Sequence, residues 1–86
     1  MLITLSVRDF AAKLASSEPA PGGGSAAAVT GLLGISLLEM VISLTRGRAA
    51  YAAYDQFLAA KQEELANLHS KMEVLVDEDA AAFRQV

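Results

Sequence analysis

Carboxylates on apolar helix faces are the residues of this chain best suited to acid–base chemistry. Asp79 follows Leu75 by four residues and precedes Phe83 by four, so on a helix it shares their apolar face. A carboxyl group facing an apolar interface has a raised pKa unless a cation or hydrogen-bond donor compensates it, and a raised pKa suits a general acid. The alternative is that Asp79 pairs with an Arg or Lys, or faces a solvent-filled space. Asp77 points well away from this face.

Glu39 has a similar setting, because Leu32, Ile35 and Ile42 lie seven, four and three residues from it. The same argument applies, and here we favour the ordinary alternative over a chemical role: Glu39 pairs with an Arg or Lys, or faces a solvent-filled space.

The segment 19–25, with the sequence PAPGGGS, could receive a ligand through its main chain. Prolines and consecutive glycines are costly inside a helix, so we expect a loop here. A helix-compatible run starts directly behind it, with Ser25 as the expected N-cap. A loop without side chains at a helix N-terminus exposes backbone N–H groups. Proteins build sites for anions and for closely approaching flat ligands in this way.

Three helices, over about residues 7–16, 25–46 and 51–86, must position these groups. Ser6 and Asp9 are spaced as in a capping box, and Gly47 suits the end of the second helix. No strand pattern competes, so the predicted fold class is all-α. The third helix has apolar residues at helical spacing, namely Tyr54, Phe57, Leu58, Leu65, Leu68, Met72, Leu75, Val76 and Phe83.

The run from Ala26 to Thr45 is long and apolar enough to span a bilayer. A transmembrane reading would place Glu39 well inside the span, at a cost of about 2.5–3.5 kcal/mol. The run is also rich in small residues. We therefore expect a buried central helix, with Gly31 and Gly34 allowing a neighbour to approach closely. Burying it needs more protein surface than the other two helices supply.

Composition excludes several classes of protein. The chain has 86 residues, no Cys and one His, so we expect at most one small domain, without disulfides, a thiolate metal site or a multi-histidine metal centre. A net charge of −3 without a basic cluster argues against nucleic acid as a partner. The N-terminus lacks the features of a signal peptide, so we expect a cytoplasmic protein with no membrane partner.

Several segments, in order, resemble one family. PAPGGGS at 19–25 resembles the PTPGGGS signature of the formiminotetrahydrofolate cyclodeaminase and methenyltetrahydrofolate cyclohydrolase family. Phe10 with residues 14–16 looks like the family's opening helix. Residues 43–48, followed by Tyr51, look like its "LT-x-G-K" stretch, and residues 75–83 resemble its "DEDAxAF" segment. The glycine motif alone would be weak, whereas the ensemble is fairly specific.

The resemblance implies a helical domain that acts on a one-carbon unit of tetrahydrofolate, with the folate derivative as substrate and no tightly bound cofactor or metal. The cyclodeaminases, which are lyases, close 5-formiminotetrahydrofolate to 5,10-methenyltetrahydrofolate and release ammonia. The cyclohydrolases interconvert the methenyl and 10-formyl forms with water. Both reactions need proton transfer at a tetrahedral carbon between two folate nitrogens, which a carboxyl group with a raised pKa could supply.

Site residues follow from the matched motifs. Asp79 is the first candidate for the acid–base group, because the family motif and its position on the apolar helix face both select it. Asp77 is the second candidate. Arg48 faces either the folate glutamate, with or without a polyglutamate tail, or solvent at a helix end. We read His69, at the edge of the apolar stripe, as structural or surface. We expect the substrate to bind in a single cleft. The residues expected to line it are Pro21, Gly22, Gly23, Gly24, Ser25, Thr45, Arg48 and Tyr51.

The family's domain is about twice as long as this chain, so residues 1–86 match its N-terminal part. We expect a homodimer or higher homo-oligomer that completes the helical bundle and covers the apolar central helix. The alternative function is a non-catalytic helical oligomerisation module, or an inactive fragment of such an enzyme.

Overall fold

The chain folds into helices only, over the part that the structure describes. The structure, a computed structural model, describes residues 1–17 and 21–85, and the side chains of 79–85 lie outside that description. Its elements are η1 (Leu2–Thr4), α1 (Val7–Ala15), α2 (Gly23–Thr45), η2 (Ala49–Tyr54) and α3 (Asp55–Gln85). The all-α prediction is confirmed.

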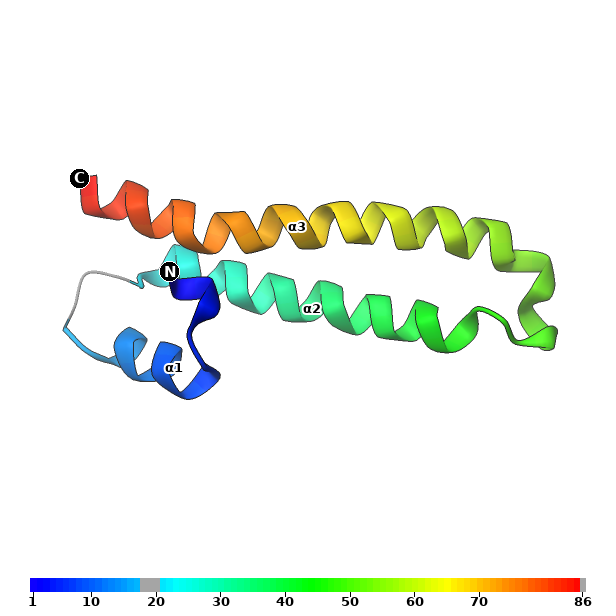
Figure 1. Cartoon of the computed structure of the whole chain (residues 1–86), viewed down its shortest axis with the longest axis horizontal. Helices are drawn as coiled ribbons and strands as arrows, with labels where there is room; N and C mark the ends of the chain where they lie inside the picture. Colours follow the sequence, from blue (N-terminus) through cyan, green and yellow to red (C-terminus); the bar gives the residue numbers. More distant parts are fainter. Residues whose placement is uncertain (18–20, 86) are drawn as a thin grey trace.

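The long helices α2 and α3 lie side by side and antiparallel, and α1 lies beside the first half of α2 (Figure 1). Both ends of the chain lie at the same end of this hairpin. The molecule measures 52 × 23 × 16 Å. Its radius of gyration of 16.4 Å exceeds the value of about 12 Å for a compact domain of this length, so the fold is elongated.

The helix boundaries confirm two sequence signals and correct another. Ser6 caps α1, since its Oγ accepts a hydrogen bond from the Asp9 N–H at 3.0 Å. Gly47 ends α2 with a φ of +84°, which glycine adopts without strain. The predicted cap at Ser25 is wrong, because α2 begins at Gly23 with Gly22 as its N-cap. Glycine is tolerated there because first-turn N–H groups make no intrahelical bond.

The corner between α2 and α3 replaces the predicted start of the third helix at Tyr51. Residues 49–54 form η2, where Tyr51 has non-helical φ and ψ of −115° and 16°. Arg46 closes the corner through two hydrogen bonds to Asp55, at 3.1 and 3.2 Å, and one to Gln62 Oε1 at 2.6 Å. The α-helical geometry of α3 therefore begins only at Asp55.

The two long helices meet along a stripe with alternating spacings of three and four residues, as in a coiled coil. The buried or half-buried positions are Ser25, Ala28, Leu32, Ile35, Glu39 and Ile42 on α2, and Leu58, Gln62, Leu65, His69, Met72 and Val76 on α3. Four members of the predicted apolar stripe are instead exposed, namely Tyr54, Phe57, Leu68 and Leu75. Among the side chains that the structure describes, the buried apolar core is small and consists of Leu2, Ala28 and Val76.

The outer face of α2 is not covered within this chain, in agreement with the expectation that its burial needs more protein surface than the other two helices supply. Half or more of each of the following side chains is exposed: Leu33, Leu37, Leu38, Met40, Val41 and Leu44. A Cβ at Gly31 would lie 3.2 Å from Met72 Cε, as close packing predicts, whereas one at Gly34 would meet nothing within 4 Å. In the described chain, α2 alone is long and apolar enough to cross a membrane, a property that core helices of soluble proteins share.

Candidate functional site

The glycine-rich start of α2 presents main-chain donors at one end of the hairpin. Gly22 is extended, and no described side chain caps it. The first intrahelical bond runs from the Ala26 N–H to the Gly22 carbonyl at 3.1 Å, so the N–H groups of residues 23–25 precede the helical ladder. Gly23 is exposed, and a Cβ there would meet nothing within 4 Å. A ligand can therefore approach this helix end at the backbone, where the helix dipole favours negative charge.

Ser25 fixes this helix end against α3 instead of facing a ligand. Its side chain is fully buried, and its Oγ donates a hydrogen bond to the Val76 carbonyl oxygen at 2.8 Å. The expected role of Ser25, which is to receive the ligand through its backbone N–H, stays a prediction, while its hydroxyl binds α3. Pro21, four residues earlier, is also buried.

Asp77 binds the N-terminal turn of the chain. Its Oδ1 accepts the Leu2 N–H at 2.7 Å and its Oδ2 accepts the Ile3 N–H at 3.3 Å. The carboxylate is half-buried and holds η1 over the contact between Ser25 and Val76. No local sequence pattern predicts this anchoring role, because the partners of Asp77 are backbone groups 75 and 74 residues away.

Asp79, the first acid–base candidate, belongs to α3, and its side chain lies outside the described residues. Its backbone position is two residues beyond Asp77, at the end of the hairpin where α2 begins. The chemical role of Asp79 stays a prediction.

Thr45, Arg48 and Tyr51 lie at the opposite end of the hairpin (Figure 1). The 23 residues of α2 separate them from the glycine-rich end by about 34 Å. Thr45 Oγ1 donates to the Val41 carbonyl at 2.7 Å, while Arg48 and Tyr51 are exposed. One cleft containing both groups is therefore not formed within a single copy, and that expectation is wrong for this chain.

An apolar hollow of about 290 Å³ adjoins the glycine-rich end and was not anticipated from the sequence. It is formed between the N-terminal segment and α2, and its size is near the lower limit for ligand pockets. Its lining includes Leu2, Leu5, Phe10, Leu14, Val29 and Leu33.

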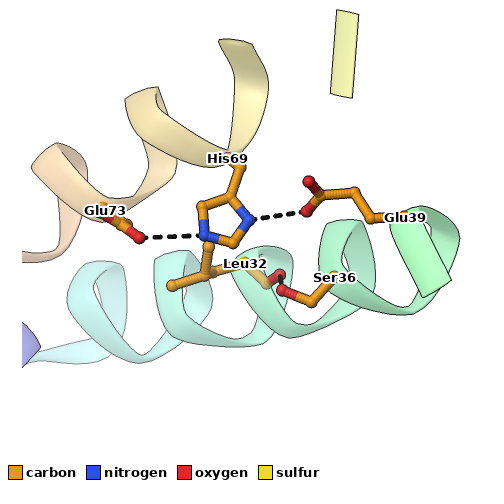
Figure 2. A network of polar contacts seen from close by, with 5 residues as sticks. All are labelled: Leu32, Ser36, Glu39, His69 and Glu73. Carbon is orange, nitrogen blue, oxygen red and sulfur yellow. Dashed lines mark hydrogen bonds and ion pairs between the residues drawn. The ribbon is translucent and has the colours of Figure 1, made fainter. Parts of the chain in front are cut away.

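A polar network joins the middle of the two long helices (Figure 2). His69 Nδ1 lies 2.7 Å from Glu39 Oε1, and His69 Nε2 lies 3.0 Å from Glu73 Oε1. The hydrogen bond to Glu39 raises the pKa of His69, against a smaller lowering by desolvation. Glu39 thus has a partner, as favoured from its spacing, although the partner is a histidine. The spacing of four and three residues from Leu65 to His69 to Met72 was the signal that could have placed His69 on the inner stripe.

Among the described residues, no group of three or more His, Cys, Asp and Glu side chains could hold a metal ion.

Comparison with known proteins gives matches over nearly the whole chain. The family model described as formiminotransferase-cyclodeaminase matches residues 6–86. A methenyltetrahydrofolate cyclohydrolase of Methylorubrum extorquens is 36% identical over 80 residues, which cover 93% of this chain and 38% of that protein. A formimidoyltransferase-cyclodeaminase of Mus musculus is 34% identical over 82 residues, which cover 95% of this chain and 15% of that protein. The chain thus spans well under half the length of these curated relatives. No solved structure matches significantly.

Proposed function

Because the chain belongs to the formiminotransferase-cyclodeaminase family, we propose that its glycine-rich helix end is part of a site for a one-carbon derivative of tetrahydrofolate. The reaction of that site is the closure of 5-formiminotetrahydrofolate to the 5,10-methenyl form with release of ammonia, or the hydrolysis of the methenyl form. Relatives with names for both activities match this chain at similar identity.

One observation carries the proposal: the start of α2, with its free main-chain donors, is fixed beside the part of α3 that bears Asp77 and precedes Asp79. The link is the buried hydrogen bond from Ser25 to Val76. A carboxylate or carbonyl oxygen of the folate would accept hydrogen bonds from the N–H groups of residues 23–25. The adjacent apolar hollow suits the aromatic part of the ligand.

Proton transfer is the chemical task that remains. In the cyclisation, one folate nitrogen attacks the formimino carbon, and the proton lost from that nitrogen is balanced by one gained at the imine nitrogen, which becomes an amino group. The amino group then takes up a further proton and leaves as ammonia, and the methenyl cation remains. Asp79 would deliver that proton. Asp77 is less suited to the same step, because both of its oxygens already accept main-chain N–H groups.

Self-association is the second part of the proposal. The exposed apolar side chains on α2 form a face that a second copy could cover, as a homodimer or higher homo-oligomer. An antiparallel neighbour could also bring Arg48 and Tyr51 of one copy toward the glycine-rich end of another. The same face favours the alternative function, a helical oligomerisation module without catalysis.

Calorimetric titration with a tetrahydrofolate polyglutamate tests the proposal. The unchanged protein should bind, and Gly23→Val should weaken binding by at least about tenfold, because a side chain would block the main-chain donors. Gly34→Val is the matched control, since a Cβ at Gly34 also meets no atom within 4 Å but lies outside the site. Asp79→Asn should retain binding and lose turnover. Absence of folate binding, with intact self-association in sedimentation, would favour the non-catalytic module.

A further inference from the structure

The network of His69, Glu39 and Glu73 places one imidazole between two carboxyl groups (Figure 2). The distances of 2.7 Å and 3.0 Å are both hydrogen-bond distances, one to each ring nitrogen. Glu39 belongs to α2, whereas His69 and Glu73 belong to α3, so the network crosses the hairpin. All three side chains are partly exposed: 33% for His69, 27% for Glu39 and 49% for Glu73.

Both contacts can be hydrogen bonds to ionised carboxylates at once only when the ring carries two protons. Ionised carboxylates only accept hydrogen bonds, and a neutral imidazole has one N–H and one lone pair. With neutral His69, one of the two contacts would set a lone pair against a carboxylate oxygen. A proton placed on a carboxyl group would also relieve that conflict, but the imidazole is the stronger base by about two pKa units.

The surroundings contain few competing charges. From α2, the ring is faced by Leu32, Ser36 and Glu39, and the Ser36 hydroxyl donates to the Leu32 carbonyl oxygen at 2.8 Å. Glu39 is the only charged residue of α2. On α3, Glu73 is the other group in contact, while Lys71 is exposed two residues away, a spacing that turns it from the ring.

We propose that His69, as an imidazolium between Glu39 and Glu73, is a protonation-dependent clamp that holds α2 against α3. Loss of the proton removes one of the two hydrogen bonds and the charge that compensates Glu39 on the inner stripe. The hairpin therefore loosens as the pH rises. This inference does not depend on the proposed folate chemistry.

The direction follows from the linkage between proton binding and folding. The hydrogen bond to Glu39 is the largest influence on His69 and raises its pKa in the folded chain above the ordinary value of 6.5. The stabilisation that protonated His69 provides is therefore fully present below the pKa that His69 has in the unfolded chain. It is lost as the pH rises through the folded pKa.

An NMR titration of the intact chain tests the clamp directly, because the chain contains a single histidine and its ring signals need no assignment. The pKa of His69 should exceed 6.5 and should fall in Glu39→Gln, with a smaller fall in Glu73→Gln. Glu63→Gln removes an exposed charge from the same helix and should leave the titration unchanged. An unshifted pKa in the unchanged protein, or equal effects of Glu39→Gln and Glu63→Gln, would overturn the proposal.

Urea unfolding gives a second, independent readout of the same clamp. As the pH rises from about 5.5 to about 8.5, the urea concentration at the midpoint of unfolding should fall for the unchanged protein. This fall should disappear in His69→Gln. Glu73→Gln keeps the contact between helices and should retain part of the decline. If the midpoint of His69→Gln declines as steeply as that of the unchanged protein, His69 is not a pH-dependent clamp.

Discussion

The Ser25 hydroxyl on α2 donates a hydrogen bond to the Val76 carbonyl oxygen on α3 at 2.8 Å, and both side chains are fully buried. This contact joins residues 51 positions apart in the chain. It holds the glycine-rich start of α2 against α3 immediately before Asp77, so the geometry of the proposed site depends on it.

Replacing Ser25 with Ala should lower the free energy of unfolding by about 1 kcal/mol. The Val76 carbonyl loses its side-chain donor, and the small core beside it loses a packed atom. Urea denaturation followed by circular dichroism measures the difference. Ser43→Ala, on an exposed position of the same helix, should change stability by no more than about 0.5 kcal/mol. Equal effects of the two changes would contradict a special role for Ser25.

Asp77→Asn should release the N-terminal turn. One oxygen of Asp77 can still accept an N–H, but the amide group that replaces the other cannot. We expect faster hydrogen exchange at the amides of Leu2 and Ile3, and a loss of about 1–3 kcal/mol in stability. Glu78→Gln is the neighbouring control, because Glu78 is exposed. Unchanged exchange at Leu2 in Asp77→Asn would refute the anchoring role.

The Arg46–Asp55 pair should support the corner near neutral pH and lose this effect in acid. The hydrogen bonds from Arg46 lower the pKa of Asp55 below its ordinary value of 3.8, so its contribution is present above that value and is lost as the pH falls through the folded pKa. Arg46→Lys cannot form the two-pronged contact and should raise the pKa of Asp55 in carboxyl ¹³C NMR. Arg48→Lys, in the same corner, should leave that pKa unchanged. The same pKa in both variants would argue against the pairing.

Gly47→Ala should destabilise the chain by about 1–2 kcal/mol, because a φ of +84° is unfavourable for any residue with a Cβ. Gly34→Ala is the matched control. It lies within α2, where alanine is favoured over glycine, and its added Cβ would meet nothing within 4 Å, so it should stabilise the chain by up to about 1 kcal/mol. The unfolding temperatures of the two variants should therefore shift in opposite directions from that of the unchanged protein. An unchanged or higher unfolding temperature for Gly47→Ala would show that the backbone of residue 47 is not constrained.

The elements that local rules control could be predicted from the sequence. The Ser6 cap, the end of α2 at Gly47 and the all-helical fold of residues 1–17 and 21–85 depend on neighbouring residues and helical spacing, and all three were predicted correctly. The start of α2 was misplaced because glycine is costly within a helix but not in its first turn. The start of α3 was misplaced because Arg46 binds Asp55 and Gln62, a contact that no local pattern reveals.

The candidate site was less predictable, because it depends on which parts of the chain meet. The glycine-rich segment was found from its composition, but the use of Ser25 and Asp77 as structural anchors depends on partners more than 50 residues away. The placing of Arg48 and Tyr51 in the same cleft ignored the length of α2. His69 was expected at the edge of the apolar stripe, as a structural or surface residue. Its contacts with Glu39 and Glu73 were not expected, because the contact with Glu39 depends on how the two long helices are aligned.

The polar contacts along the hairpin also determine its register. The facing surfaces of α2 and α3 are built mainly from aliphatic side chains, and a slide of one turn, about 5.4 Å, would exchange one aliphatic contact for another. The same slide would separate Ser25 from Val76 and Glu39 from His69, leaving polar groups against apolar neighbours. These two contacts therefore select one alignment among several that the apolar surfaces alone would tolerate, as a buried polar residue does in a coiled coil.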